Sequence, residues 1–202
     1  MPKIILHSLS RRALRFTVLA QVLMLAACTN LTSGPEFPMP ESSLDTLQTW
    51  AFKGKLKAKR GTDAQTANIS WTNAKEHYAI RLSGPFGFGS TLIEGNDDGV
   101  KIVRPGQADI VATSGQVLLK RALGIDLPIE ALQSWVKGVP SKHHRLDALV
   151  LNTEGIADSF SQLGWQIKLS NHRTYGLWRL PGKLIATKDD LQLLIVMSVW
   201  QP

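Results

Sequence analysis

The chain has 202 residues, the length of one domain, and 44% of them are hydrophobic, which is enough to build a packed core. Its single cysteine excludes an internal disulfide and any metal site built from paired cysteines. Part of the formal net charge of +7 belongs to the N-terminal segment, because four basic residues and no acidic residue precede position 28.

The first 27 residues are predicted to be a cleaved signal peptide. Their basic residues precede an apolar run at 16–25, which is much shorter than the ~20 residues needed to cross a bilayer as a helix. The segment ends in Leu25-Ala26-Ala27-Cys28, which resembles the bacterial lipobox, where the cysteine thiol receives diacylglycerol. A spanning anchor, or an ordinary signal followed by a chance cysteine, is the alternative. The agreement of charge, length, small residues and cysteine favours lipidation of Cys28.

The segment after Cys28 is predicted to be a tether. Residues 29–43 contain three prolines and several hydroxyl side chains, which cannot build a core. Thr29 follows the cysteine, where an aspartate favours inner-membrane retention in enteric-type bacteria, so we expect the outer membrane. We therefore divide the chain into a signal peptide at 1–27, an acylated N-terminus and tether at 28–43, and one domain at 44–202.

The mature chain is only mildly basic. Without the signal peptide it has 19 basic and 16 acidic residues, a net charge of +3. This balance does not indicate a nucleic-acid partner. It is compatible with an acidic partner or an anionic headgroup layer.

Alternating apolar and polar residues predict strands in the first half of the domain. Every second residue from Lys53 to Lys59 is a lysine, which is typical of a strand with one wet and one buried face. The stretches 67–72 and 78–82 alternate in the same way, and the polar residues between them predict a hairpin. Further strands are expected near 90–94, 99–104 and 108–112.

The pattern changes to a helical period between residues 114 and 138. Ser114 is placed to cap a helix that ends at Gly124. A second helix has Pro128 in its first turn and stops before Gly138. The apolar residues on these helices are Val117, Leu118, Ala122, Leu123, Ile129, Leu132, Trp135 and Val136.

Alternation returns in the last third of the chain. We expect strands at 146–151, at 165–169, near Trp178, at 183–187 and at 191–200. A sheet this large curls because its strands twist, and two amphipathic helices need an apolar face to cover. The prediction is a mainly β fold, an incomplete antiparallel β-barrel of about 10–11 strands with a small α-helical lid over an apolar cavity.

The usual signatures of catalysis are missing, so we do not expect an enzyme, a cofactor or a metal. The sequence has no HExxH, GxSxG or phosphate-loop lysine motif. The segment Gly87–Leu92 has a leucine where a dinucleotide loop needs its third glycine. His143 and His144 lie in a polar stretch that favours a solvated loop over a metal site.

The stretch Leu82–Gly89 is unusual because it places phenylalanines between turn residues. Pro85 and Gly87 favour a tight connection between strands, and such turn tips face solvent. Phe86 therefore has two interpretations. It folds back onto the barrel rim as part of the core, or it projects as a membrane wedge.

These residues resemble the LolB family of outer-membrane lipoprotein receptors over nearly the whole mature domain. The resemblance depends on Gly84–Gly87, on Leu127-Pro128-Ile129 leading through Leu132 to Trp135–Pro140, on Gln162–Ile167, and on Leu180-Pro181. The second motif is fairly specific, because Leu-Pro, the helical tryptophan and Gly-x-Pro must all fall in register.

The resemblance implies an unclosed antiparallel β-barrel with a helical lid and an apolar interior. It also implies a receptor, anchored in the outer membrane and facing the periplasm, that accepts acylated lipoproteins from the periplasmic carrier LolA. The receptor places them in the inner leaflet of the outer membrane without nucleotide hydrolysis. Family members carry an exposed apolar residue, often leucine, in the Pro-x-Gly loop, where it is important for membrane insertion. Phe86 occupies that position between Pro85 and Gly87, with a larger side chain.

Six residues are predicted to line the acyl-chain cavity, and we expect the protein to act as a monomer. They are Trp71, Tyr78, Ile80, Leu82, Leu132 and Trp135. The lysine row from Lys53 to Lys59 either attracts an acidic carrier or lipid headgroups, or is simply a solvated strand face. A structural or assembly-assisting lipoprotein without a lipid cavity is the alternative function.

Overall fold

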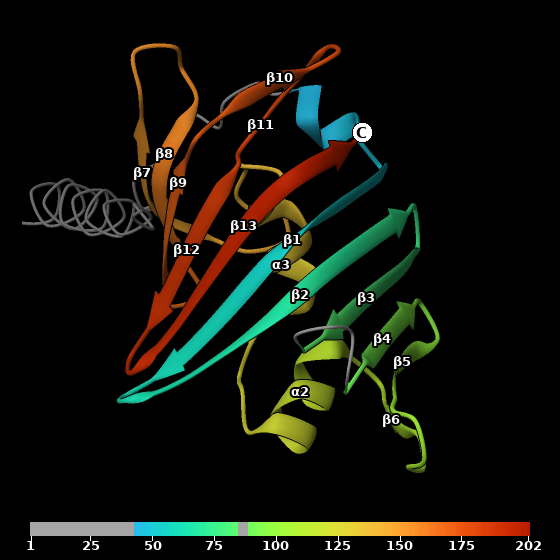
Figure 1. Ribbon diagram of the computed structural model, residues 1–202. Coiled ribbons are helices and arrows are strands. Elements are labelled where there is room, and N and C mark those ends of the chain that lie inside the picture. Colours follow the sequence, from blue (N-terminus) through green and yellow to red (C-terminus); the bar gives the residue numbers. More distant parts are fainter. Residues whose placement is uncertain (1–42, 85–88) are drawn as a thin grey trace, which may run out of the picture. The chain divides into compact units, whose positions relative to one another are not determined.

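The computed structural model in Figure 1 describes residues 43–84 and 89–202. The predicted signal peptide, Cys28, nearly all of the tether, and the segment Pro85–Phe88 lie outside these ranges. The strands of the described residues are β1 (Thr49–Arg60), β2 (Asp63–Ala74), β3 (His77–Ser83), β4 (Thr91–Asn96), β5 (Gly99–Val103), β6 (Ile110–Ala112), β7 (Leu146–Leu151), β8 (Ala157–Gln162), β9 (Trp165–Ser170), β10 (Arg173–Tyr175), β11 (Trp178–Leu180), β12 (Lys183–Lys188) and β13 (Leu191–Gln201). The helices are the 3₁₀-helix η1 (Ser43–Thr46), α2 (Gly115–Leu123) and α3 (Ile129–Trp135).

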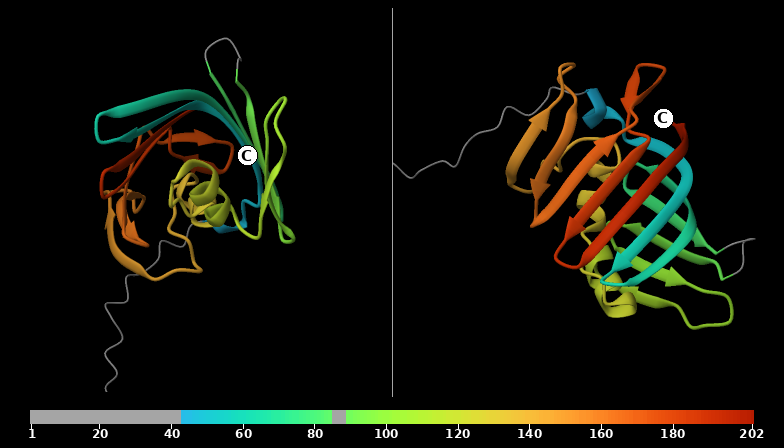
Figure 2. Two further views of the ribbon diagram at one scale, coloured as in Figure 1. Left: turned by 90° about the horizontal axis from the view of Figure 1, so that it is seen from below. Right: turned by 60° about the vertical axis from the view of Figure 1, so that its left-hand side comes forward.

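Eleven of the strands form one antiparallel sheet in the order β6-β5-β4-β3-β2-β1-β13-β12-β9-β8-β7. The pairing of β1 with β13 joins the start of the domain to its end, and β6 and β7 are the two edges. The sheet curls around α2 and α3, as the left panel of Figure 2 shows, and its edges do not pair with each other. The predicted incomplete barrel with a helical lid is therefore confirmed.

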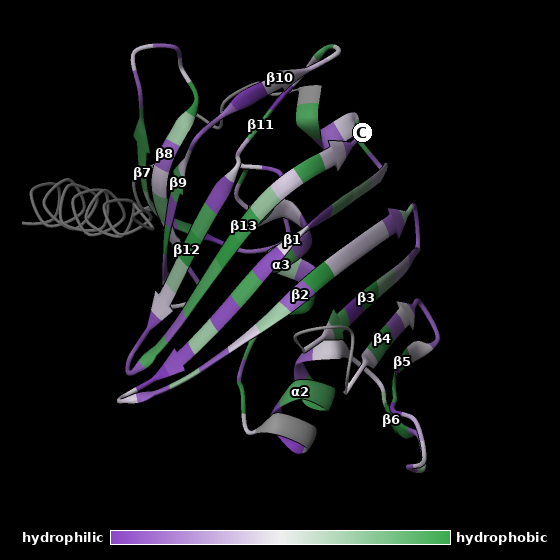
Figure 3. Cartoon of the chain, in the orientation of Figure 1, coloured by the Kyte–Doolittle hydropathy of each residue, from purple (hydrophilic) through white to green (hydrophobic). Residues whose placement is uncertain are grey.

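The alternation along β1 sorts its side chains between the two faces of the sheet. Trp50 and Phe52 are buried, whereas Lys53, Lys55 and Lys57 are exposed. The same alternation gives the striped hydropathy of β1 in Figure 3. The apolar face lines the concave side, because burying it there removes apolar surface from water.

A register shift between Lys53 and Gly54 interrupts the pairing of β1 with β13. A Cβ atom at position 54 would collide with the backbone carbonyl of Val196. Glycine therefore permits the close approach of the two central strands at this irregularity, a common role for glycine within a strand.

The two helices begin and end where local chemistry directs them. The side chain of Ser114 accepts a hydrogen bond from the backbone N–H of Val117, and Gly124 ends α2 with a φ of 65°. Pro128 precedes the first residue of α3, and Glu130 lies in its first turn. Helix α3 ends at Trp135, earlier than the sequence predicted, and a turn continues the chain to Gly138. In the described residues, neither helix is long and apolar enough to cross a bilayer.

Three elements escaped the sequence prediction. Strand β8 is polar apart from Ala157 and Phe160, β10 has three residues, and η1 spans the expected boundary between tether and domain at residue 44. Tertiary pairing rather than local pattern makes β8 a strand, because β7 and β9 flank it on either side.

Candidate lipid-binding hollow

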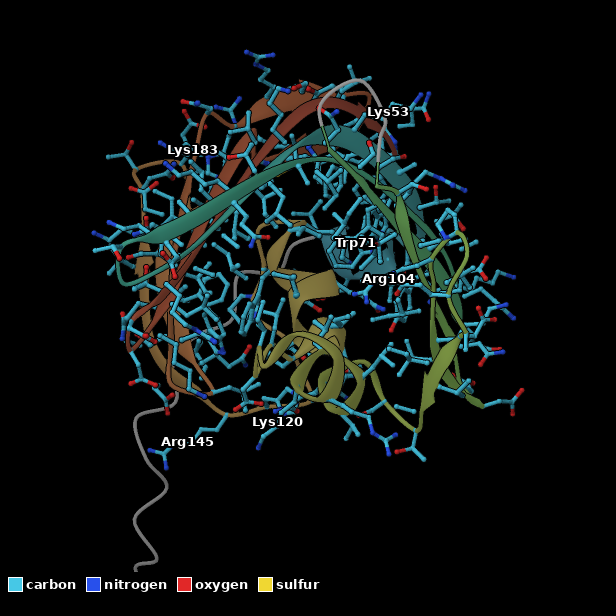
Figure 4. All side chains as sticks on the ribbon, turned by 60° about the horizontal axis from the view of Figure 1, so that its bottom comes forward. Lys53, Trp71, Arg104, Lys120, Arg145 and Lys183 are labelled. Carbon is cyan, nitrogen blue, oxygen red and sulfur yellow. The ribbon has the colours of Figure 1, made fainter. Side chains whose placement is uncertain are left out.

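An internal cavity of 80 Å³ lies between the concave face of the sheet and the helices, and every residue that lines it is apolar. The sheet contributes Leu56, Ala58, Ile69, Trp71, Ile80, Leu82, Ile93, Leu193 and Ile195. The helices and their connection contribute Leu119, Ile125, Leu127, Ile129 and Leu132. In Figure 4 the side chain of Trp71 lies on the inner side of the curled sheet, and Lys53 and Lys183 lie on its outer side.

Four of the six predicted cavity residues line this space: Trp71, Ile80, Leu82 and Leu132. Trp135 does not, because its Nε1 donates to Gln162 Oε1 at 2.9 Å and its ring packs against Phe160 and Trp165. Tyr78 does not either. Its ring covers Gly95, where a Cβ atom would collide with it.

The alternation of the strands indicated which face each residue occupies, but not how far along the cavity it lies. Sequence reasoning missed Leu56 and Ala58, although the lysines that alternate with them carried the necessary signal. It also missed Leu193 and Ile195 of β13, which come next to β1 only through the pairing of distant segments.

An aromatic cluster adjoins the hollow through Trp71, which lines it. Phe52 lies 5.0 Å from Trp200 and 6.0 Å from Trp71, measured between ring centroids, and Trp50 contacts all three rings. Trp200 is held by a hydrogen bond of 2.9 Å from its Nε1 to the carbonyl of Pro181. Packed rings of this kind make a rigid wall, because such contacts have a preferred geometry.

One end of the hollow leads toward the hairpin between β1 and β2. A second hollow of 330 Å³ shares Leu56, Ala58, Leu82 and Ile125 with the cavity and continues to a rim that includes Arg60. The two hollows together are therefore apolar inside and polar at the mouth.

Exposed contacts hold the connection between α2 and α3 against the sheet. Arg60 Nη2 donates to the carbonyl of Gly124 at 3.0 Å. Asp126 accepts a hydrogen bond of 2.6 Å from Gln116 and lies 3.7 Å from Lys188 Nζ. The Gln116 hydrogen bond, followed by the positive charge of Lys188, lowers the pKa of Asp126. Water reaches all of these contacts, so each is easily exchanged.

A buried network, by contrast, holds the end of α3. The Gln162 side chain accepts from Trp135 and from the backbone N–H of Ser141, and it donates to the carbonyls of Ser141 and His144 at 2.8 Å each. Gln162 is fully buried, so losing any of these bonds would leave polar groups without partners. The far end of the lid is therefore held by buried hydrogen bonds. Helix α2 and its connection are held by the apolar packing of Leu118, Leu119 and Leu127 and, against the sheet, by exposed polar contacts.

Burial also shifts the pKa values of Tyr78 and Lys137, which lie outside the cavity. Burial, followed by the charge of Glu130, raises the pKa of Tyr78, whose hydroxyl has no hydrogen-bond partner. Burial lowers the pKa of Lys137, which donates to the carbonyls of Leu44 and Leu47 at 3.1 Å and thereby ties down η1. Within residues 43–84 and 89–202, no group of three or more His, Cys, Asp or Glu residues is arranged to hold a metal ion.

A larger hollow in the described part of the chain is separate from the cavity. It has a volume of 560 Å³, opens to solvent along β2 to β6, and is lined in part by His77, Glu94 and Lys101. Glu94 and Lys101 form an ion pair of 3.1 Å within it. Size alone would favour this hollow, but the smaller internal cavity is the one suited to an apolar ligand.

Comparison with known proteins identifies the family. The family model of the outer membrane lipoprotein LolB matches residues 48–200. The outer-membrane lipoprotein LolB of Cellvibrio japonicus is 32% identical over 186 residues, which cover 90% of this chain and 92% of that protein. The LolB of Pseudomonas putida strain F1 is 30% identical, over 95% of this chain and 96% of its own length.

Among solved structures, a domain from Vibrio parahaemolyticus ascribed to outer membrane lipoprotein sorting has a similar fold. It superposes with a TM-score of 0.54 at 9% sequence identity and covers 76% of this chain and 84% of its own. This likeness supports the fold, and the sequence matches decide the family. The chain belongs to the outer membrane lipoprotein LolB family.

Proposed function

We propose that this protein is a receptor, lipid-anchored in the outer membrane through Cys28 and facing the periplasm. It accepts acylated lipoproteins from the soluble carrier LolA and inserts them into the inner leaflet of that membrane. The observation that carries the proposal is the wholly apolar hollow beneath the helices of a LolB-family chain. An apolar lining suits fatty acyl chains, which gain ~0.8 kcal/mol per CH2 on leaving water.

The hollow must enlarge before it can take cargo. Its 80 Å³ is less than the ~150 Å³ of an engineered cavity that holds one benzene molecule. The polar contacts between the α2–α3 connection and the sheet are exposed, so we place the opening movement in α2 and this connection. The described arrangement then corresponds to an empty, closed receptor.

Energetics favour direct handover over release into water. Three acyl chains represent on the order of 30 kcal/mol of transfer energy, at ~0.8 kcal/mol per CH2. Non-covalent affinity saturates near ~20 kcal/mol, so release of such a cargo into water would be far too slow. Direct transfer from the opening of the carrier to the opening of the receptor, and then into lipid, lets each step lower the free energy slightly. Such transfer needs no nucleotide and no catalytic group.

We assign the membrane-inserting role to Phe86, on the basis of its place in the Pro-x-Gly segment of the family. An apolar side chain enters the acyl layer at little cost, whereas a charged one resists it. The described residues on either side of the segment are Gly84, whose carbonyl accepts a hydrogen bond of 3.3 Å from Asn68, and Gly89.

The experiment that tests the proposal is transfer of a radiolabelled lipoprotein from its soluble carrier to the purified protein, and then to vesicles. We expect transfer in the absence of any nucleotide. The competing function is a structural or assembly-assisting lipoprotein, which the small volume of the closed cavity favours. Failure of the cargo to leave the carrier would select that alternative.

A further inference from the structure

The outer face of the sheet has a cationic patch that the transport cycle described above does not use. It consists of Lys53, Lys55, Lys57 and Lys59 of β1, Lys168 of β9 and Lys183 of β12. Their strands are close neighbours in the sheet order β2-β1-β13-β12-β9. We call these six residues the lysine face.

The lysine face has almost no compensating charge. The five neighbouring strands contain one acidic residue, Asp63, at the very start of β2. Within the described part of the chain, no ion pair involves any of the six lysines, while lysines elsewhere pair with Glu94, Asp45 and Asp126. Uncompensated like charges repel one another, so this surface suits an anionic partner.

Strand register spreads the charges evenly over the face. Lys55 pairs with Val196, which pairs with Lys183, so two lysines flank one valine about 10 Å apart at ~4.8 Å between strands. In the next row, Lys57 pairs with Leu194. The valines at 196 and 199 are 38% and 53% exposed, which leaves apolar surface between the charges. Cations spread among shallow apolar contacts match a headgroup layer better than a single bound anion.

Asn68 connects the lysine face to the strand end that precedes the proposed membrane segment. Its Oδ1 accepts from Lys55 Nζ at 3.0 Å, and its Nδ2 donates to the carbonyl of Gly84 at 3.3 Å. One side chain therefore joins the lysine face to the backbone just after β3.

We propose that the lysine face docks the domain onto the anionic phospholipids of the membrane that anchors it. The inference rests on the proposed lipid anchor, since a tether of about fifteen residues keeps the face within reach of headgroups. Near an anionic surface each lysine contributes roughly a five-fold factor in binding, and the contribution falls with added salt. Docking holds the receptor flat against the leaflet that receives the cargo.

The test is lysine footprinting of the lipidated full chain in vesicles. The protein is placed in two kinds of vesicle, one of phosphatidylcholine alone and one of phosphatidylcholine mixed with phosphatidylglycerol. A water-soluble acetylating reagent is then added to each sample. We expect Lys55, Lys57 and Lys183 to react at least five-fold more slowly with phosphatidylglycerol present, and high salt to remove the difference. Lys75 and Lys120, which lie outside the face, should react equally in both.

Paired variants make the result specific. The double variant Lys53→Gln with Lys57→Gln loses two lysines, each worth about a five-fold factor. The ratio of docked to undocked protein should therefore fall roughly 25-fold, and Lys183 should regain its reactivity toward the reagent. Lys75→Gln with Lys120→Gln removes the same charge elsewhere and should leave the footprint unchanged. Folding of both variants is checked by circular dichroism.

Three outcomes would overturn the proposal or its basis, and they are distinguishable. Protein that stays in solution when vesicles are sedimented contradicts the anchor, and with it the proposed function. Protein that sediments but shows the same footprint in both lipids contradicts headgroup docking alone. Protection that appears only when the carrier protein is added assigns the lysine face to the carrier instead.

Discussion

At the scale of single residues, Phe86 and Gln162 are the positions where one side chain has the clearest consequence. Phe86→Glu should still accept cargo from the carrier but deliver it poorly to vesicles, because a carboxylate resists the acyl layer. The measurement follows labelled lipoprotein through both steps. Phe86→Leu, which keeps an apolar side chain, is the control and should deliver normally. Full delivery by the glutamate variant would contradict the membrane-inserting role of Phe86.

Gln162 should be a large contributor to stability. Gln162→Leu leaves the Trp135 indole N–H and three backbone groups of the buried network without partners, so we expect a loss of about 3 kcal/mol or more. Urea titration measures the change. Gln166→Leu is the matched control at an exposed position and should cost less than about 0.5 kcal/mol. Equal midpoints for the two variants would contradict this role.

At the scale of elements, the two parts of the lid are held differently. Helix α3 is anchored by the buried hydrogen bond of Trp135. Helix α2 is packed through Leu118 and Leu119, and the polar contacts between its connection and the sheet lie at the surface. An opening that swings α2 away can therefore leave α3 in place. Amide hydrogen exchange distinguishes the two helices, because it reports local opening separately from global unfolding.

Arg60→Ala should favour the open lid. The lost hydrogen bond to Gly124 has a net value of about 0.5–1.5 kcal/mol, so the open population should rise roughly two- to ten-fold. Faster exchange of the α2 amides, with α3 unchanged, is the expected result. Arg179→Ala removes an arginine paired with Glu154 away from the lid and serves as the control. If α2 and α3 exchange faster together, the division of the lid is wrong.

At the scale of the whole molecule, the receptor and the structural protein differ in whether the interior opens. We expect a hydrophobic fluorescent dye to bind the purified protein slowly, at a rate set by lid opening, because the closed cavity holds only 80 Å³. Arg60→Ala should accelerate the binding. A dye that never binds, in either protein, would support the alternative of a lipoprotein without a lipid cavity.

The sequence alone determined the fold class, the family, the buried face of most strands and the caps of α2 at Ser114 and Gly124. The strand faces and the caps depend on residues close together in the chain, where period and capping chemistry act directly, and the family depends on motifs spread along the sequence. The lipidation of Cys28 and the role of Phe86 stay predictions, because both residues lie outside the described ranges.

Only the tertiary structure decided which of those buried residues line the hollow. It brought Ile195 beside Leu56, moved Trp135 and Tyr78 out of the cavity, and made the polar segment at Ala157–Gln162 a strand with Gln162 at the centre of a buried network. Each of these outcomes depends on the register between segments far apart in the sequence. A local pattern specifies which side of a strand faces the core, but the contacts there are set only when distant strands pair.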